Sequence, residues 1–430
     1  MDRRQFFERL LGGTALSLYA LRELNGAIYD SINSLNDAYQ QVPSPDGAYW
    51  DAVKKHYLME NNLIMMNNGT VGPIPQPVYN TMMEYFKVQM TTPSDLYTYF
   101  PAKVEEVRYK LASFANVSSD EVAITRNTTE GLNFVANGLD MKEGDEVLMS
   151  NLEHPSMTNA WRLKAKRYGI KVTEVPLGVP PKSVEEIVDA FRKAITPRTK
   201  IIAVAHTIFI TGLITPLKEL SDLAHKNGLL ILADSAHGIG MIDLKLHDWG
   251  VDFYASSPYK WLGAPPEAGF FYVRKDVQDK LWPTIGFSGW DTYKTAKRFE
   301  TFSQRADALV MGLGEALNFQ TVIGKSRVER RVKSLASYLK SSLRDIPGFK
   351  LHTNTDEYLS AGLTAFSIKG VNPEDVVNHV REKYNIVVRT IGNADRGTLG
   401  VRVSTHIFVS TRDIDLLVQG VREVARNSGA

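Results

Sequence analysis

Short apolar runs alternate with amphipathic helical stretches throughout the segment 121–273. The apolar runs have the length of strands, whereas the stretches between them repeat with a period of 3.6 residues. Parallel strands require crossover helices of this kind, and those helices cover both faces of the sheet. The pattern therefore predicts an α/β domain with a large, mostly parallel sheet. The expected strands are 121–125, 146–149, 170–175, 200–206, 229–234, 252–256 and 268–273.

A second pattern follows this sheet. Residues 304–345 carry two long helical patterns, and strands and helices then alternate irregularly up to Arg426. We expect a large domain over 46–290 and a smaller C-terminal α+β domain over 291–430, and the first short helix, 49–61, could join the smaller domain. The composition, 43% hydrophobic and 23% charged, is typical of a soluble globular protein of this size. The expected elements of the smaller domain are strands 363–368, 386–390 and 400–404 and helices 373–384 and 411–426.

Charge and cysteine content exclude several classes of function. The net charge is +2, which gives no electrostatic reason to expect a nucleic-acid partner. The helix predicted over Lys325–Arg344 is strongly basic, and we interpret it as a solvated helix face. The chain contains no cysteine, so disulfides, thiolate catalysis and Cys-ligated metals are excluded, and we expect no metal site.

The amino terminus has the features of an export signal. Arg3 and Arg4 precede two phenylalanines and a 12-residue apolar run, Leu10–Leu21, which is too short to span a bilayer as a helix. This segment resembles a bacterial twin-arginine signal; an ordinary amphipathic helix is the alternative. We expect residues 1–45 to be a leader followed by a polar linker over 22–45. The predicted location is the periplasm, with the cytoplasm as the alternative, and an uncleaved leader would be the one membrane tether.

Asp234 and Lys260 stand out in the predicted sheet. They lie 26 residues apart, each at the carboxyl end of a predicted strand, where open α/β sheets bind ligands. A pyridoxal phosphate (PLP) site needs a lysine that forms a Schiff base with the aldehyde and an aspartate that holds the pyridine nitrogen protonated. Taken singly, an aspartate after a strand is usually a turn residue and a lysine is usually a surface charge. Their joint placement favours the PLP site.

Other polar residues are expected at the same edge of the sheet. Thr128 and Thr129 lie between a predicted strand and a helix, where free backbone N–H groups form a seat for a phosphate. His154 follows the next strand and opens a helix, which would let its ring stack on a planar cofactor. Simple helix capping is the alternative for these residues.

Two arginines and one loop are candidates for binding the substrate. Arg389 and Arg402 lie on or beside strands of the smaller domain, and a strand arginine is rarely buried without an anion. They could grip a substrate carboxylate, or they could form a structural salt bridge. Asn68 lies in a loop rich in glycine and proline that could lie beside a ligand or be a plain connector.

Together these residues resemble the class V aminotransferase family of fold-type I PLP enzymes. The similarity runs from about Asn67 to Val424, and the motifs that carry it are NNGTVGPIPQPV, TRNTTEGLN, LEHPSMTNAW, HTIFITGLITPLKEL, ADSAHGIG and YKWLGAPPEAGFFYV. The last motif, with ADSAH, looks most like the isopenicillin N epimerase branch. The resemblance implies a large seven-stranded domain, a small C-terminal domain, and a homodimer in which the segment around Ser303 reaches the partner's phosphate site.

The resemblance also implies a role for each residue. Lys260 would form the Schiff base and later move the proton, Asp234 would pair with the pyridinium nitrogen, and His154 would stack on the ring. Arg402 would bind the substrate carboxylate, with Arg389 as a second candidate and Asn68 nearby. The residues that complete the cofactor site would be Thr128, Thr129 and Ser257 at the phosphate, Tyr259 beside them, and His237 near the ring hydroxyl.

Three positions depart from the family pattern. The loop Ile391–Thr398 lacks the cysteine that desulfurases use as a nucleophile, Tyr259 replaces a usual histidine, and Phe209 replaces a polar residue near the ring hydroxyl. We therefore expect a PLP enzyme that acts at Cα of a small amino acid or an amino-acid-containing peptide, with epimerase or aminotransferase chemistry, and not a cysteine desulfurase. The alternatives are a PLP-dependent β-lyase of the same family and a PLP-binding protein without turnover.

Overall fold

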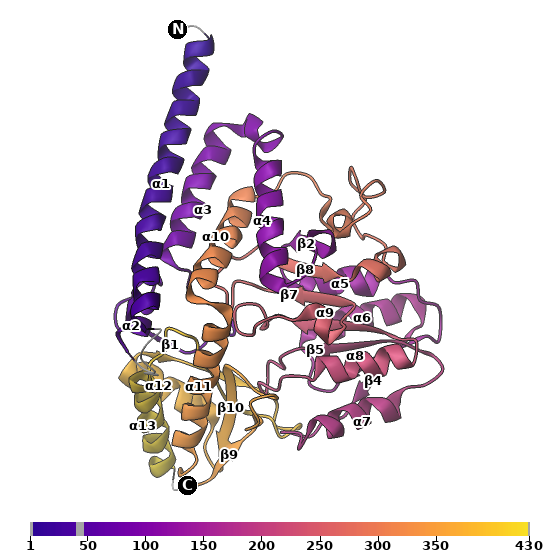
Figure 1. Ribbon diagram of the computed structural model, residues 1–430. Helices are drawn as coiled ribbons and strands as arrows, with labels where there is room; N and C mark the ends of the chain where they lie inside the picture. The colour runs from indigo at the N-terminus through magenta and orange to yellow at the C-terminus, as the bar shows by residue number, and fades with distance from the viewer. Residues whose placement is uncertain (1–2, 40–46, 429–430) are drawn as a thin grey trace.

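A seven-stranded sheet forms the centre of the larger part of the molecule, on the right in Figure 1. The computed structural model describes residues 3–39 and 47–428. The strand order is β2-β8-β7-β6-β5-β3-β4, and β8 is antiparallel to both of its neighbours while the other pairs are parallel. This confirms the predicted fold class. The strands are β2 (Val122–Thr125), β3 (Glu146–Ser150), β4 (Lys171–Val175), β5 (Thr199–Ala205), β6 (Leu230–Ser235), β7 (Phe253–Ser256) and β8 (Gly269–Val273).

Helices cover both faces of this sheet because successive strand residues point to opposite sides. On β5, Ile201 and Ala203 pack in one apolar cluster with residues of α5 and α6. Ile202 and Val204 pack in a second cluster with residues of α4, α7, α8 and α10. The strands are therefore buried on both sides, as a parallel sheet requires. The helices are α4 (Phe100–Ala115), α5 (Thr128–Gly138), α6 (Pro155–Tyr168), α7 (Val184–Ala194), α8 (Leu217–Lys226), α9 (Leu246–Trp249) and α10 (Asp307–Ile323).

The smaller part of the molecule is built on a four-stranded antiparallel sheet of order β12-β13-β10-β9. Its apolar cluster includes Tyr49, Trp50 and Val53 of α2 (Ala48–Lys55), so the first short helix packs with this part of the chain. The other elements are β9 (Phe349–Leu351), β10 (Leu363–Ile368), β12 (Arg389–Ile391), β13 (Gly400–Ser404), α11 (Lys325–Leu343), α12 (Pro373–Tyr384) and α13 (Thr411–Asn427). Four short 3₁₀ helices, η1 (Pro93–Leu96), η2 (Ser119–Glu121), η3 (Lys275–Lys280) and η4 (Ala296–Glu300), connect larger elements.

One predicted strand, 386–390, is two strands in the structure. β11 (Ile386–Val387) pairs in parallel with β1 (Ile64–Met65), whereas β12 pairs antiparallel with β13. The chain changes partner at Val388, which is buried. This change ties the loop that follows β1 to the strand that carries Arg402.

The prediction of a polar linker over residues 22–45 is wrong for residues 22–39, which are part of the first helix. α1 (Arg3–Tyr39) is continuous, so residues 22–39 are helical and residues 40–45 of the predicted linker lie outside the described part of the chain. Its second half packs along α3 (Gln76–Thr91) and α10, and Ile32 is fully buried there. The sequence looked like a linker because the residues between Arg22 and Tyr39 are mostly polar. Within residues 3–39 and 47–428, no helix combines the length and the apolar character needed to cross a membrane.

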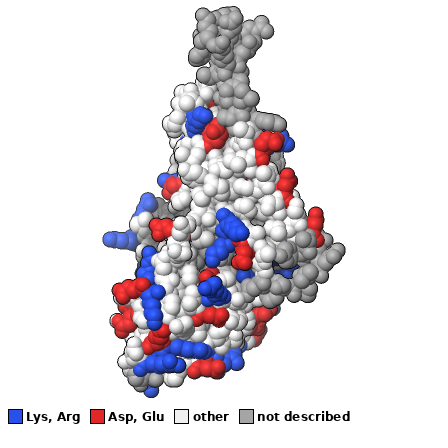
Figure 2. Space-filling model, turned by 90° about the vertical axis from the view of Figure 1, so that its left-hand side faces the viewer, with Lys and Arg blue, Asp and Glu red and all other residues white. Residues whose placement is uncertain are grey.

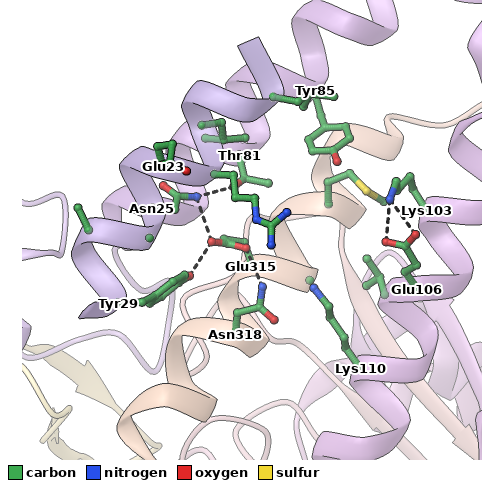
Figure 3. A pocket seen from close by; sticks show the side chains of 18 of the residues that line it. Glu23, Asn25, Tyr29, Thr81, Tyr85, Lys103, Glu106, Lys110, Glu315 and Asn318 are labelled. Atoms are coloured by element: carbon green, nitrogen blue, oxygen red, sulfur yellow. Dashed lines mark hydrogen bonds and ion pairs between the residues drawn. The ribbon is translucent and has the colours of Figure 1, made fainter. Parts of the chain in front are cut away.

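Polar side chains fix α1 to the body of the molecule, as Figure 3 shows. Glu315 of α10 accepts hydrogen bonds from Tyr29 Oη at 2.6 Å and from Asn25 Nδ2 at 3.0 Å. Asn25 Nδ2 also donates to Thr81 Oγ1 of α3 at 3.1 Å. The cavity between these helices is lined by both acidic and basic side chains, and Lys103 and Glu106 pair with each other inside it.

The basic helix α11 uses much of its charge inside the molecule rather than on an open face. Lys325 pairs with Asp243 at 3.1 Å, and Lys340 donates to the carbonyl of Asn354 and to Ser360. The guanidinium of Arg331 lies over the ring of Trp50. Figure 2 shows acidic and basic side chains interspersed over the face that carries α1. The expectation of a solvated helix face is therefore wrong for these residues.

Candidate active site

The carboxyl ends of β5, β6 and β7 and the starts of α5 and α6 surround one cavity. All of the predicted cofactor-binding residues line it, because the ends of parallel strands meet at one edge of the sheet. The lining residues are Thr128, Thr129, His154, Ser156, Ala205, Thr207, Phe209, Asp234, Ala236, His237, Ser257, Tyr259 and Lys260.

Asp234 is the penultimate residue of β6 and is 4% exposed. Burial raises the pKa of its carboxyl group, while the N–H of Ala236, which donates to Oδ1 at 3.1 Å, and the charge of Lys260 oppose that rise. A buried carboxyl group is costly unless it is paired. Its position suits it to hold a protonated ring nitrogen. The opposite charge of that nitrogen would offset the free-energy cost of burying the carboxyl group.

Lys260 lies on the turn after β7, close to Asp234. Burial lowers the pKa of its amino group to about 8; Asp234 opposes this effect, and the charges of Arg402 and Arg389 add to it. With a pKa of about 8, about one amine in ten is uncharged at pH 7. Only the uncharged amine is a nucleophile, so the site prepares Lys260 to react with an aldehyde.

A loop of the chain holds Lys260 from its backbone side. Asn68 Nδ2 donates to the carbonyl of Lys260 at 3.2 Å, and the N–H of Gly72 donates to that of Tyr259 at 3.0 Å. A Cβ atom on Gly72 would come within 2.5 Å of the carbonyl oxygen of Lys260, so only glycine fits there. Asn68, predicted to contact the substrate, therefore positions the lysine turn.

His154 caps α6 and faces the same cavity. Its Nδ1 accepts the N–H of Ser156 at 3.1 Å, and its ring packs edge-on against Phe209 with centroids 4.7 Å apart. Burial lowers the pKa of His154 to about 4, and the positive charges of Lys260, Arg389 and Arg402 add to this effect. The ring is therefore neutral at pH 7.

The start of α5 brings together hydroxyl groups. Thr128 Oγ1 lies 2.7 Å from Ser257 Oγ, and the N–H of Thr128 donates to the same Ser257 oxygen at 3.1 Å. Thr129 Oγ1 donates to Ser156 Oγ at 3.0 Å. Asn127 caps the helix through the N–H of Glu130, and the hydroxyl groups gather at the positive end of the helix, where a phosphate could bind.

Arg402 and Arg389 lie outside the lining of the cavity but act on it electrostatically. Arg402 is 2% exposed, and its guanidinium donates to Asn67 Oδ1 and Thr70 Oγ1, each at 3.1 Å, and to the carbonyl of Phe209. Arg389 is exposed and donates to Thr70 at 3.3 Å. Burial lowers the pKa of Arg402 to about 10, and the charge of Arg389 adds to this effect.

Thr207, which lines the cavity, and Glu153, which does not line it but interacts with Asp234, were not identified from the sequence. The hydroxyl group of Thr207 is buried, faces the cavity and has no hydrogen-bond partner among the described residues. Thr207 follows the end of β5 at Ala205, so the rule that selected Asp234 and Lys260 would also have found it. Glu153 accepts the N–H of Ala205 at 2.8 Å and Ser150 Oγ at 2.6 Å. Burial raises the pKa of Glu153 to about 8, and the charge of Asp234 adds to that rise.

These residues fit PLP. The cavity is lined by a buried amine (Lys260), a buried acid (Asp234) and a neutral imidazole ring (His154). It also contains the hydroxyl groups at the start of α5 and the hydroxyl group of Thr207, which has no hydrogen-bond partner among the described residues. Fold and site together define a PLP-dependent enzyme of the fold-type I class. The family model for class-V aminotransferases matches residues 64–417, and the chain belongs to that family.

Three proteins are similar to this chain over most of its length. A probable cysteine desulfurase of Methanothermobacter thermautotrophicus is 29% identical over 84% of this chain and 94% of its own length. The isopenicillin N epimerase of Amycolatopsis lactamdurans is 26% identical over 88% of this chain and 99% of its own. The structure of a cystine C–S lyase with its reaction product, cysteine persulfide, superposes with a TM-score of 0.76 over 85% of this chain and 98% of that one, at 23% identity, which is a likeness of fold.

These comparisons contradict the predicted reaction. We expected epimerase or aminotransferase chemistry and excluded a cysteine desulfurase, but curated relatives at 29% and 30% identity are probable cysteine desulfurases. The exclusion rested on the missing thiol in the loop Ile391–Thr398. A missing thiol limits where the sulfur goes after a C–S bond breaks, but it does not prevent the bond from breaking, and the exclusion was wrong for this reason.

Proposed function

We propose that this protein is a PLP-dependent β-lyase that cleaves the C–S bond of a small cysteine-derived amino acid, such as cystine. The observation that carries the proposal is a desulfurase-like chain with a buried reactive amine, Lys260, but without a single cysteine among 430 residues. The sulfur therefore leaves with its own substituent instead of passing to an enzyme thiol. The likeness of the fold to that of a cystine C–S lyase supports the β-lyase proposal.

The reaction is a β-elimination. The Cα–H bond and the Cβ–S bond break, the electron pair of the first forms a Cα–Cβ double bond, and the sulfur leaves with the pair of the second. Water then converts the unsaturated product to a 2-oxo acid and ammonium, and the sulfur group takes up a proton. Bound PLP supplies the electron sink that stabilises negative charge at Cα.

The residues of the chain have separate tasks in this reaction. Lys260 would hold the cofactor and, when its amine is free, accept the proton from Cα, since burial lowers its pKa to about 8 and leaves about one amine in ten uncharged at pH 7. Asp234 would keep the ring nitrogen protonated, and His154 would stack on the ring. Arg402 binds the carboxylate of the substrate with a fork of two N–H donors.

The test is product analysis with the purified PLP-loaded protein. Cystine should yield pyruvate, ammonium and cysteine persulfide in equal amounts, without an added thiol acceptor. Lys260→Ala should lose this activity, and Lys275→Ala, which changes an exposed lysine, should keep it. Exchange of the α-hydrogen with deuterium from heavy water without any 2-oxo acid would overturn the β-lyase assignment.

We also propose that the protein is a homodimer. Large apolar side chains are exposed between Trp282 and Tyr293, near the segment of Ser303 that the family resemblance places beside a partner's phosphate site. Light scattering of the PLP-loaded protein should give twice the mass of the 48.1 kDa chain. A single-chain mass at micromolar concentration would contradict this proposal.

We further propose export by the twin-arginine route, for which Arg3 and Arg4 and the apolar run Leu10–Leu21 are the support. Residues 1–45 fused to a folded reporter should carry it into the periplasm. Replacing both arginines by lysine should retain the reporter in the cytoplasm, and export of that variant would remove the support for this location.

A further inference from the structure

His237 lies between the reactive lysine and a buried tryptophan. Its Nε2 lies 3.5 Å from Lys260 Nζ, and its Nδ1 lies 3.1 Å from the indole nitrogen of Trp261. His237 is 2% exposed and Trp261 is fully buried, so no bulk water competes for either ring nitrogen.

The indole contact determines which nitrogen of His237 carries the hydrogen. An indole N–H can only donate a hydrogen bond, so Nδ1 of His237 must accept it. Burial lowers the pKa of His237 well below its ordinary value, and the charges of Lys260, Arg402 and His154 act in the same direction. The imidazole is therefore neutral, and its single hydrogen is on Nε2, the nitrogen that faces Lys260.

Trp261 cannot turn away from this contact. Its backbone carbonyl accepts hydrogen bonds from Gln320 Nε2 at 2.8 Å and from His406 Nε2 at 3.0 Å. Its indole stacks on His406 with centroids 5.7 Å apart and an interplanar angle of 22°. A Cβ atom on Gly362 would come within 2.5 Å of the indole ring, so the ring fills its space completely.

We propose that Trp261 is a positioning residue that fixes the tautomer of His237, so that His237 presents a hydrogen-bond donor, and never an acceptor, on the side of Lys260, where the ring hydroxyl of PLP would lie. The proposal rests on PLP binding at Lys260 and not on the lyase reaction. A donor at this position stabilises a negatively charged oxygen. It also excludes His237 as the base that removes the Cα proton, which leaves that task to Lys260.

The charges around His237 agree with this role. Lys260 lies on the turn after β7, Arg402 on β13 and His154 at the start of α6, and each acts on His237 with positive or potentially positive charge. A second hydrogen on the imidazole would add a further cation to this group, which desolvation makes costly. The negatively charged group that accepts a hydrogen bond from His237 would therefore belong to the cofactor.

The direct test is ¹⁵N NMR of the histidine side chains in the PLP-loaded protein, with the signals of His237 assigned by their loss in His237→Gln. We expect the hydrogen on Nε2 from pH 6 to pH 9. Detection of the hydrogen on Nδ1 in the unmodified protein, or of a doubly protonated ring, would overturn the proposal without any variant of Trp261.

A second test uses the visible absorbance of bound PLP as a function of pH. Trp261→Phe removes the indole N–H and should shift the midpoint of the titration by about one pH unit, because a hydrogen bond to one protonation state is lost. The same substitution in a His237→Leu background should produce no shift. Equal shifts in both backgrounds would mean that Trp261 acts through packing alone.

Trp161→Phe is the matched control. Trp161 is also fully buried, but its indole nitrogen has no hydrogen-bond partner among the described residues, so this variant removes the same atoms without removing a hydrogen bond. The titration midpoint should stay where it is in the unmodified protein. A shift in Trp161→Phe as large as that in Trp261→Phe would also overturn the proposal. Neither test measures turnover, so both tests can still be interpreted if the lyase assignment is wrong.

Discussion

Arg389 and Arg402 lie directly opposite each other in the register between β12 and β13. Two like charges in this arrangement repel and destabilise a sheet. Neither guanidinium forms an ion pair with a carboxylate in the described part of the chain; Asn67, Thr70 and a backbone carbonyl are their partners. A carboxylate brought in by the substrate would relieve the repulsion.

Arg402→Lys should therefore weaken substrate binding. Lysine keeps the charge but loses the planar fork that grips a carboxylate with two bonds. We expect KM for the amino acid to rise about 10- to 100-fold, which corresponds to about 1.5–3 kcal/mol for a charge-assisted contact. Steady-state kinetics with a parallel measurement of PLP content checks this. Arg389→Lys, at the exposed partner, should have a smaller effect, and an unchanged KM in Arg402→Lys would contradict the assigned contact.

Capture of PLP by the cofactor-free protein should depend on pH through Lys260. Burial lowers the pKa of this amine to about 8, and only the uncharged form attacks an aldehyde. The rate of capture should therefore rise with pH through a midpoint of about 8 and level off above it. Stopped-flow absorbance gives the profile, and borohydride reduction with peptide mapping should locate the pyridoxyl group on Lys260. A midpoint near the ordinary lysine value of about 10.4, or a label on another lysine, would contradict the assignment.

The sheet and most of the cofactor site were predictable because each depends on local pattern. A strand that ends in a polar residue places that residue at the carboxyl edge, and this rule found Asp234, Lys260 and His154. Thr207 also follows the end of a strand, but it was not selected because its hydroxyl group carries no charge. Glu153 was missed because an acid before a histidine looks solvated until the neighbouring strand is seen to bury it.

Contacts between distant segments could not be predicted. The second half of α1 looks like a linker because the groups that hold it, such as Glu315, are 286 to 290 residues away in the chain. The hydrogen bond between Trp261 and His237 joins residues of two different strand ends, and only the fold brings the indole to the imidazole. The reaction type was mispredicted because one missing side chain, the thiol, was taken to decide the chemistry of the whole site.

Glu153 should make the stability of the protein fall with rising pH. Its pKa is raised to about 8 in the folded chain and is about 4.5 in the unfolded chain. The unfolded chain therefore loses this proton first, and the stability that the proton provides is present below pH 4.5 and lost as pH rises to about 8. Glu153→Gln removes this dependence, so relative to the unmodified protein the variant should gain stability between pH 5 and pH 8.

Urea unfolding at several pH values measures this difference, and Glu146→Gln is the matched control. Glu146 is also buried, but hydrogen bonds from Thr173, Thr196, Lys171 and Thr199 overcome the effect of burial and lower its pKa to about 2. The stability that Glu146 provides is therefore lost only as pH falls from about 4.5 toward 2. Its variant should show a constant difference between pH 5 and pH 8. A constant difference for Glu153→Gln as well would mean that Glu153 is ionised in the folded protein.

The second half of α1, which packs along α3 and α10, should be part of the folded protein even when the residues before it are removed. Ile32 is fully buried, and Asn25 and Tyr29 bind Glu315. Ile32→Ala should lower the free energy of unfolding by about 2–4 kcal/mol, because it leaves a cavity against α10 and α11. Ser31→Ala, at an exposed position of the same helix, should change it by less than about 0.5 kcal/mol.

Two truncations extend this argument to the leader. Removal of residues 1–17 leaves the contacts of Asn25, Tyr29 and Ile32 in place, so the melting temperature of the PLP-loaded protein should stay close to that of the full chain. Removal of residues 1–38 deletes those contacts and uncovers Glu315 and its neighbours on α3 and α10, and the melting temperature should fall. Equal melting temperatures for the two truncated proteins would show that α1 is an appendage rather than part of the fold.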